Sequence, residues 1–224
     1  MKRIVGFFTI ALLALLTTGI PAFARGGHTP KPAGHIVCID PGHGGTDPGA
    51  VMNGAYGQIT EANENLAISI NLENFLTANG VKWIATRTTD VTLTNAQRYT
   101  YCNNNGATLE LSIHLNGSTN NTIDYTETLY GKKTKDYTWA QTVDNSLANL
   151  SAATGSGTIQ NNGVTSYADG VLLKSNMPAA LAETVFITNT NEYNLLANPA
   201  NNGSRQQLIA GYLANAIESW FATH

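Results

Sequence analysis

Short apolar runs alternate with longer amphipathic stretches along most of the chain. The short runs are rich in β-branched residues and are followed by Gly, Pro or polar residues, as buried strands are. The longer stretches repeat apolar residues every three or four positions, and Gly80 follows the first of them as a helix stop. The pattern predicts strands at 35–40, 81–86, 109–113, 125–130, 171–173 and 180–187, and helices at 61–79, 93–103, 136–153 and 205–221.

This alternation of strands and helices indicates an α/β fold. We expect a single three-layer domain in which a mostly parallel or mixed twisted sheet is flanked by helices. The polar stretch 154–166 is predicted to be a surface loop. In sheets of this kind, functional groups gather on loops just beyond the carboxyl ends of strands. Candidate chemistry is therefore expected after the strands at 35–40 and 109–113.

The N-terminal segment has the layout of a secretory signal peptide. Lys2 and Arg3 precede an apolar run at 4–16, and the small-residue pattern Ala-Phe-Ala follows at 22–24. A membrane anchor is the alternative, but this run of 13 residues is shorter than the roughly 20 that span a bilayer. We expect a cleaved signal peptide at 1–24, a flexible leader at 25–34, and a folded domain at 35–224 with no stable membrane span after cleavage.

Charged residues are scarce in this sequence. Asp, Glu, Lys and Arg make up 12% of the 224 residues, about half of the usual 25%. The formal net charge of -3 excludes a basic nucleic-acid-binding protein, and the 42% of hydrophobic residues excludes a disordered chain. Cys38 and Cys102 could form a disulfide in an exported protein, but buried free thiols are an equal alternative because Cys38 lies in an apolar run.

Three residues are candidate ligands of a metal ion. His43 lies in the glycine-rich loop 40–49 directly after the first strand. His114 ends the apolar strand at 109–113, where an imidazole is costly to bury without a specific partner. Glu61 begins the first helix. Two histidines and one carboxylate from separate elements, completed by water, are a common ligand set of catalytic zinc.

A fourth candidate is Glu183, which lies inside the apolar stretch 181–187. A buried acid is unfavourable unless it is paired or functional, and beside a metal-bound water it acts as a general base and then as an acid. The structural alternative is a pairing with a cluster of backbone groups or with Arg87. We interpret Arg87 and Asp90 as a fold-stabilising pair. For His43 the alternatives are a structural turn histidine or a phosphate loop, although the Lys-Ser/Thr pair of a P-loop is missing.

Five ordered motifs carry a resemblance to a known family. They are Asp-Pro-Gly-His-Gly-Gly-x-Asp-Pro-Gly-Ala at 40–50, Glu-x-x-x-Asn-Leu at 61–66, Thr-Arg-x-x-Asp at 86–90, Ser-Ile-His-x-Asn at 112–116 and Glu-x-x-Phe-Ile-x-Asn at 183–189. Together they cover nearly the whole predicted domain. In this order they resemble the zinc-dependent N-acetylmuramoyl-L-alanine amidases of the Amidase_3 type, which are peptidoglycan amidases.

The resemblance implies a role for each candidate residue. His43, Glu61 and His114 would bind one Zn²⁺ ion, and Glu183 would be the catalytic carboxylate. Glu64 competes with Glu61, but the family's ligand lies four residues before the Asn of the Asn-Leu pair, which selects Glu61. No organic cofactor is expected.

The implied function is that of an exported zinc hydrolase, which cleaves the amide between N-acetylmuramic acid and L-alanine in peptidoglycan or muropeptides. We expect a monomer that is secreted, periplasmic or located in the cell wall. The alternative is another zinc-dependent exported peptidase or a carboxypeptidase-like enzyme. Some family members have a helical insertion that covers the site. Here Glu183 follows His114 by 69 positions, which the predicted elements already occupy, so we expect an open site.

Overall fold

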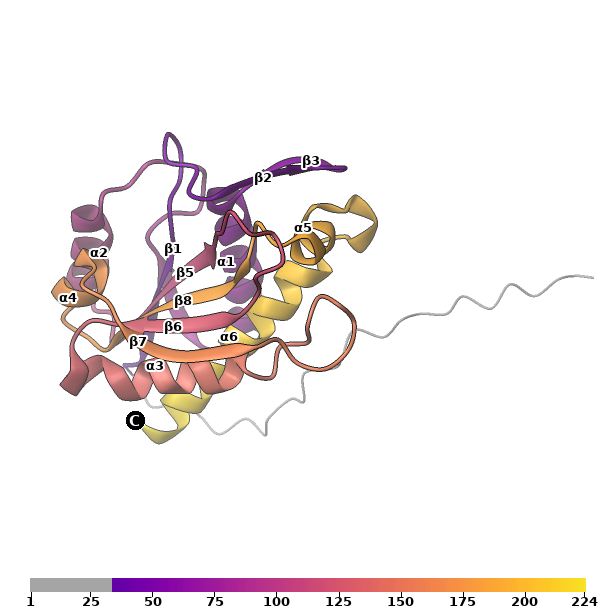
Figure 1. Ribbon diagram of the computed structural model, residues 1–224. Coiled ribbons are helices and arrows are strands. Elements are labelled where there is room, and N and C mark those ends of the chain that lie inside the picture. Colours follow the sequence, from indigo (N-terminus) through magenta and orange to yellow (C-terminus); the bar gives the residue numbers. More distant parts are fainter. Residues whose placement is uncertain (1–33) are drawn as a thin grey trace, which may run out of the picture.

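The computed structural model describes residues 34–224, and its centre is a six-stranded mixed sheet (Figure 1). The strand order is β4-β1-β5-β8-β6-β7. Strands β4, β1, β5 and β8 run parallel, whereas β6 and β7 run in the opposite direction. The bounds are β1 Ile36–Pro41, β4 Lys82–Ala85, β5 Leu109–Asn116, β6 Thr126–Tyr130, β7 Asn161–Ser166 and β8 Ala179–Phe186.

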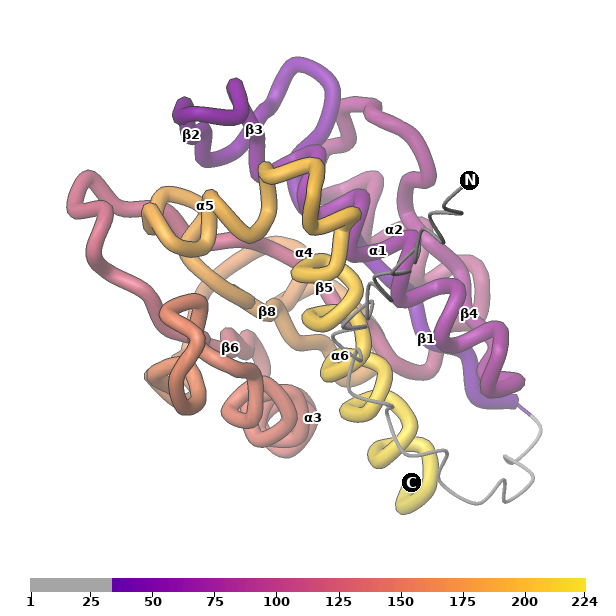
Figure 2. The backbone as a smooth tube through the Cα atoms, turned by 90° about the vertical axis from the view of Figure 1, so that its right-hand side faces the viewer, coloured from indigo at the N-terminus to yellow at the C-terminus, as the bar shows by residue number. Residues whose placement is uncertain are grey.

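Helices cover both faces of this sheet, as the side chains of β1 illustrate. Val37 and Ile39 join a core cluster with Leu72 of α1, whereas Cys38 points the other way and is bonded to Cys102 of α2. Figure 2 shows α3, α6 and α1 on one side of the molecule. The three-layer α/β arrangement predicted from the sequence is confirmed. The helices are α1 Glu61–Ala78, α2 Asn95–Asn104, α3 Lys133–Leu147, α4 Gly170–Lys174, α5 Thr190–Ala197 and α6 Ser204–Thr223.

Helix α1 begins and ends close to its predicted bounds. The hydroxyl of Thr60 accepts a hydrogen bond from the backbone N–H of Asn63 at 3.3 Å, which caps the first turn. Gly80, with a φ of 69°, ends the helix as predicted. Because Glu61 is the first residue of α1, the same cap fixes the position of a candidate ligand.

Two secondary-structure predictions are wrong. The predicted strand at 171–173 is part of the short helix α4, because the Asp169 carboxylate accepts a hydrogen bond from the N–H of Val171 at 2.7 Å and caps a helical turn. The predicted loop at 154–166 contains β7, the edge strand next to β6. The sequence of β7, Asn-Asn-Gly-Val-Thr-Ser, has one apolar residue, so the hydrophobic pattern does not reveal it.

The structure also contains elements that the sequence pattern does not predict. A hairpin occupies the connection between the loop of His43 and the start of α1, and it projects from the body of the domain in Figure 1. Helix α5 and a short 3₁₀ helix separate β8 from α6. These elements are β2 Val51–Gly54, β3 Gly57–Thr60, α5 and the 3₁₀ helix Pro199–Asn201.

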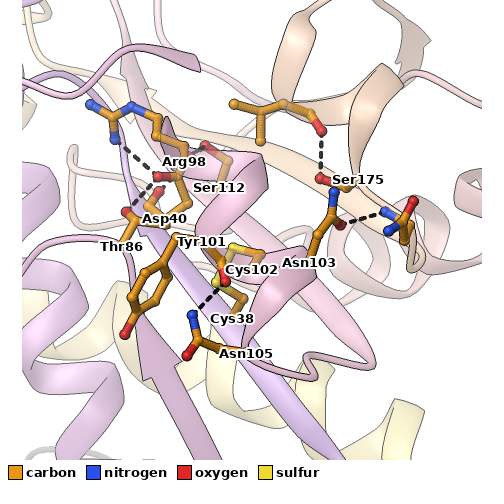
Figure 3. Close-up of a disulfide and its surroundings, with 12 residues drawn as sticks. Cys38, Asp40, Thr86, Arg98, Tyr101, Cys102, Asn103, Asn105, Ser112 and Ser175 are labelled. Carbon is orange, nitrogen blue, oxygen red and sulfur yellow. Dashed lines mark hydrogen bonds and ion pairs between the residues drawn. A yellow bond between two sulfur atoms is a disulfide. The ribbon is translucent and has the colours of Figure 1, made fainter. Parts of the chain in front are cut away.

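Cys38 and Cys102 form a disulfide, with their Cα atoms 5.6 Å apart (Figure 3). This settles the alternatives left open by the sequence in favour of the bonded pair. Both residues are fully buried, and the bond ties α2 to β1, the strand that leads into the loop of His43.

The N-terminal predictions concern residues that the structure does not describe. The predicted signal peptide at 1–24, and all but the last residue of the predicted leader at 25–34, lie outside the described residues. Within residues 34–224, no helix combines the length and the apolar character needed to cross a membrane.

Candidate active site

His43 lies in a loop where side chains approach one another closely. Its φ of 59° is a left-handed conformation that few residues with a side chain adopt. The ring of His114 fills the space beside Gly42, where a Cβ would lie 2.2 Å from the ring. A Cβ on Gly49 would lie 2.5 Å from Glu61 Oε2. The glycines of the motif therefore allow the two histidines and Glu61 to come together.

Two buried arginines anchor the backbone of this loop. Arg87 Nη2 donates a hydrogen bond to the carbonyl oxygen of Gly42 at 2.9 Å. Arg98 Nη2 donates to the carbonyl oxygen of His43 at 2.7 Å, and its Nη1 pairs with Asp40 at 2.9 Å (Figure 3). Hydrogen bonds from a charged donor are stronger than neutral ones. The backbone that presents His43 is therefore held firmly in place.

Arg87 and Asp90 both stabilise the fold, and each does so through the backbone. Asp90 Oδ1 accepts a hydrogen bond from the N–H of Gly45 at 2.6 Å. All three nitrogen atoms of the Arg87 guanidinium donate to backbone carbonyl oxygens. Of the two structural alternatives for Glu183, the pairing with Arg87 is therefore not what the structure shows.

Glu61 is fixed by backbone donors on both sides. Its Oε2 accepts a hydrogen bond from the N–H of Ala50 at 2.9 Å, and its Oε1 accepts one from the N–H of Leu115 at 3.2 Å. Asn65, one helical turn further on, points its Nδ2 toward Glu61 Oε1 at 3.5 Å and donates to the carbonyl oxygen of Gly42 at 3.3 Å. The Glu-x-x-x-Asn spacing thus places both side chains on one helix face.

His43, Glu61 and His114 form one group of ligand atoms. Glu61 Oε1 lies 3.2 Å from His43 Nε2 and 2.9 Å from His114 Nδ1. The hydrogen bond to Glu61 raises the pKa of His43 to about 9. Burial acts to lower the pKa of His114, but its hydrogen bond to Glu61 outweighs this effect and raises it. Burial acts to raise the pKa of Glu61, yet its bonds to both histidines hold that pKa far below the usual range. The carboxylate therefore stays charged.

Asp47 supports His43 from the opposite side of the ring. Its Oδ2 lies 2.9 Å from His43 Nδ1, and its Oδ1 accepts a hydrogen bond from the N–H of Gly49 at 3.2 Å. Histidines that bind metals commonly donate their second N–H to a carboxylate in this way. Asp47 is not among the candidate residues predicted from the sequence. The signal that could have found it is its place in the motif, four residues after His43.

Glu183 lies beside His114 on the neighbouring strand, because the pairing of β5 with β8 places the two residues opposite each other. Within the described part of the chain, its Oε2 is buried and has no hydrogen-bond partner. Burial raises the pKa of Glu183 to about 7, against the opposing charge of His114. A carboxyl group of this pKa in a site is suited to accept and donate protons near neutral pH.

Glu64, the competing ligand, lies outside the group. Its Oε2 accepts a hydrogen bond from Gln206 Nε2 at 2.7 Å, and burial raises its pKa. The potential metal-binding group found among the described residues consists of His43, Glu61 and His114. The structure thus brings together the three residues that the sequence singled out, and it favours Glu61 over Glu64.

The separations in this group fit a divalent metal ion. Ligand atoms at about 2.0–2.1 Å from a tetrahedral zinc ion lie roughly 3.3 Å from one another. Glu61 Oε1 is 3.2 and 2.9 Å from the two imidazole nitrogens. Two histidines and one carboxylate near the carboxyl ends of parallel strands, with the carboxyl group of Glu183 beside them, are an arrangement typical of the class of metal-assisted hydrolases.

Comparisons with known proteins narrow this class. Residues 37–219 match the Amidase_3 family, described as N-acetylmuramoyl-L-alanine amidase. The chain is 32% identical over 191 residues to the uncharacterized protein YqiI of Bacillus subtilis (strain 168). The matched region covers 84% of this chain and 85% of YqiI. It is 30% identical over 176 residues to the N-acetylmuramoyl-L-alanine amidase LytC of the same organism. This matched region covers 79% of this chain and 34% of LytC.

Solved structures show the same fold. The catalytic domain of CwlV, an N-acetylmuramoyl-L-alanine amidase from Bacillus (Paenibacillus) polymyxa var. colistinus, matches with a TM-score of 0.72 and 27% identity, and the match covers 85% of this chain and 99% of that chain. The chain therefore belongs to the N-acetylmuramoyl-L-alanine amidase family, a family of hydrolases. The resemblance of the five sequence motifs is thereby confirmed.

Proposed function

We propose that this protein is an exported zinc hydrolase that cleaves the amide between N-acetylmuramic acid and L-alanine in peptidoglycan. The observation that carries the proposal is the carboxyl group of Glu183, which lies opposite His114 of the potential metal group and whose Oε2 is buried without a hydrogen-bond partner among the described residues. Membership of the amidase family supports this choice of amide bond.

His43, Glu61 and His114 would hold one zinc ion. When bound, zinc supplies a Lewis acid and lowers the pKa of a water ligand to about 7. To bind zinc, the two histidines would give up the protons that their hydrogen bonds to Glu61 favour. Asp47 keeps the ring of His43 turned so that Nε2 faces Glu61.

Glu183 would move the proton during the reaction. With a pKa of about 7, raised by burial, its carboxylate accepts a proton from the attacking water. The resulting carboxylic acid donates this proton to the nitrogen of L-alanine as the C–N bond breaks. The products are a lactyl carboxylate on the glycan and a free stem peptide.

We also propose that the site is open to substrate without displacement of a helix. The side chains of His43 and His114 remain 25% and 18% exposed. Helix α4 lies in the interval between His114 and Glu183, but its Leu172 packs against Leu181, nearer the start of β8 than Glu183.

The remaining parts of the proposal concern the setting of the enzyme. The pattern of residues 1–24 supports export, so the protein would act in the periplasm, in the cell wall or as a secreted enzyme. A monomer suffices, because the proposed ligands and the acid all come from one chain. A surface rich in Asn, Thr and Ser suits a polymer of neutral sugars and short peptides.

Product analysis tests this function. The protein is incubated with peptidoglycan in the presence of zinc or of a chelator, and the products are identified by mass spectrometry. We expect intact glycan strands and stem peptides that begin with L-alanine, formed only with zinc. Stem peptides that are shortened but still attached to the glycan would instead indicate an exported peptidase or a carboxypeptidase-like enzyme.

A variant pair tests the role of Glu183. Glu183→Gln is expected to lose nearly all turnover while it binds zinc as the unmodified protein does, because a Gln cannot carry the proton. Glu218→Gln, a change at a helix α6 residue that accepts a hydrogen bond from Asn79, is the matched control and should keep full activity. Full activity in Glu183→Gln would rule out proton transfer by this residue.

A further inference from the structure

A second acid, Glu127, lies next to Glu183 and has no part in the mechanism proposed above. Antiparallel pairing of β6 with β8 places Glu127 directly opposite Glu183. Pairing of β5 with β8 places His114 on the other side of Glu183. Side chains of directly opposed residues point to the same face of a sheet, about 5 Å apart. His114, Glu183 and Glu127 therefore form one row across three strands.

The carboxylate of Glu127 is held in place from the edge strand. Its Oε1 accepts hydrogen bonds from Thr165 Oγ1 at 2.6 Å and from Asn162 Nδ2 at 3.2 Å. Both of these β7 residues are exposed, so this end of the row is open to solvent. Because both donors bind Oε1, the other oxygen, Oε2, is available to accept a hydrogen bond from a bound molecule.

The proposed reaction sets the direction in which the substrate crosses this row. Glu183 donates its proton to the nitrogen of L-alanine, so that nitrogen lies on the Glu183 side of His114. The stem peptide then continues from Glu183 toward Glu127 and β7. Successive residues of a peptide lie about 3.8 Å apart, and neighbouring strands lie about 4.8 Å apart. The second residue of the stem peptide therefore comes within reach of Glu127.

We propose that Glu127 determines specificity for this second residue, by accepting a hydrogen bond from it and favouring a carboxamide over a carboxylate there. A carboxamide donates an N–H to Oε2 of Glu127, whereas a carboxylate offers no donor and is repelled by the negative charge. Specificity then comes from one attractive and one repulsive contact. The inference rests on the proposed function, because that function sets the direction of the peptide.

Two synthetic muramoyl peptides that differ only in a carboxamide or a carboxylate on the second residue test this inference. For the unmodified protein we expect kcat/KM to be about tenfold higher for the carboxamide, the size expected for a hydrogen bond to a charged group. In Glu127→Gln the preference should fall to near one, mainly through faster cleavage of the carboxylate peptide, because Gln removes the charge and can donate to a carboxylate.

Two control variants separate recognition from a structural effect. Thr165→Val removes one hydrogen bond to Glu127 but keeps its charge, so the preference for the carboxamide should persist. Glu218→Gln makes the same chemical change on α6 and should leave both rates unaltered. If Glu127→Gln slows both peptides equally, or keeps the tenfold preference, the inference is overturned.

Binding measurements distinguish failure of this inference from failure of the proposed function. Calorimetry of the two free stem peptides with metal-free protein needs no turnover. If the unmodified protein cleaves neither muramoyl peptide, the proposed function fails. The specificity of Glu127 still stands if the unmodified protein binds the carboxamide peptide about tenfold more tightly than the carboxylate peptide and Glu127→Gln abolishes this difference. Equal binding of the two peptides by the unmodified protein overturns the specificity.

Discussion

Asp47 and His43 form a hydrogen bond in which Asp47 Oδ2 lies 2.9 Å from Nδ1, on the side of the ring away from Glu61. The carboxylate thereby keeps a proton on Nδ1 and leaves Nε2 as the nitrogen that faces Glu61. A carboxylate with this contact orients a metal-binding histidine and increases its basicity. The binding of zinc should therefore depend on Asp47, although Asp47 is not itself one of the proposed ligands.

Replacement of Asp47 by Ala should lower zinc affinity about 10- to 100-fold, the usual effect of losing such a support. The measurement is a competition titration against a chromophoric chelator, with circular dichroism to confirm that the fold persists. Glu218→Ala, which removes an acid from the far helix α6, is the control and should bind zinc normally. Equal affinities in the two variants would show that Asp47 does not support the metal.

Gly42 is predicted to tolerate no side chain. A Cβ at this position would lie 2.2 Å from the ring of His114, so Gly42→Ala must displace that ring. We expect a loss of zinc affinity of at least about tenfold. Gly170→Ala is the comparison, because its Cβ would lie 3.3 Å from the nearest atom, on Asn95, and needs only a small adjustment. Titration of both variants with zinc checks this, and a normal affinity of Gly42→Ala would contradict it.

The sequence predicts the buried part of this fold well and its edges poorly. Strands β1 and β5 are buried along most of their length because both faces of the sheet are covered, and their apolar residues, consecutive at 36–39 and at every second position from 109 to 113, make them visible in the sequence. The edge strand β7 has no such pattern, because none of its six residues is buried. Helix α4 depends on one capping contact of Asp169, which a pattern of three apolar residues does not reveal.

The candidate site can likewise be predicted from the sequence only in part. His114 and Glu183 can be singled out from the sequence because a polar residue at the end of, or inside, an apolar strand is costly to bury without a partner, and His43 because it lies in a glycine-rich loop directly after a strand. The contribution of Arg98 cannot be foreseen in this way. Its contact with the carbonyl oxygen of His43 arises from the packing of α2 on β1, a relationship between residues 55 positions apart.

The disulfide should contribute substantially to stability. It joins Cys38 and Cys102 across a sequence separation of 64 residues, and closing a long loop restricts the unfolded chain by about 2–4 kcal/mol. The double replacement of both cysteines by Ala should lower the free energy of unfolding by this amount. Urea denaturation, with the unmodified protein in reductant as a second reference, measures it. A midpoint equal to that of the oxidised protein would show that the bond contributes nothing.

Stability should also depend on pH through Glu110, which is fully buried on β5 between Cys38 and Ala179 of the neighbouring strands. Burial, aided by the charge of Asp40, raises the pKa of Glu110 from 4.5 to about 8. The folded protein therefore holds this proton more tightly than the unfolded chain. The stability that results is complete below pH 4.5 and is lost as the pH rises through about 8.

Replacement of Glu110 by Gln removes this dependence, since Gln stays neutral at every pH. Between about pH 5 and pH 8, the free energy of unfolding of the unmodified protein should fall relative to that of Glu110→Gln by up to about 1.4 kcal/mol per pH unit. Urea denaturation of both proteins at several pH values, with a chelator present to keep the metal site empty in each, provides the comparison. Parallel stability profiles would mean that Glu110 ionises alike in the folded and unfolded states.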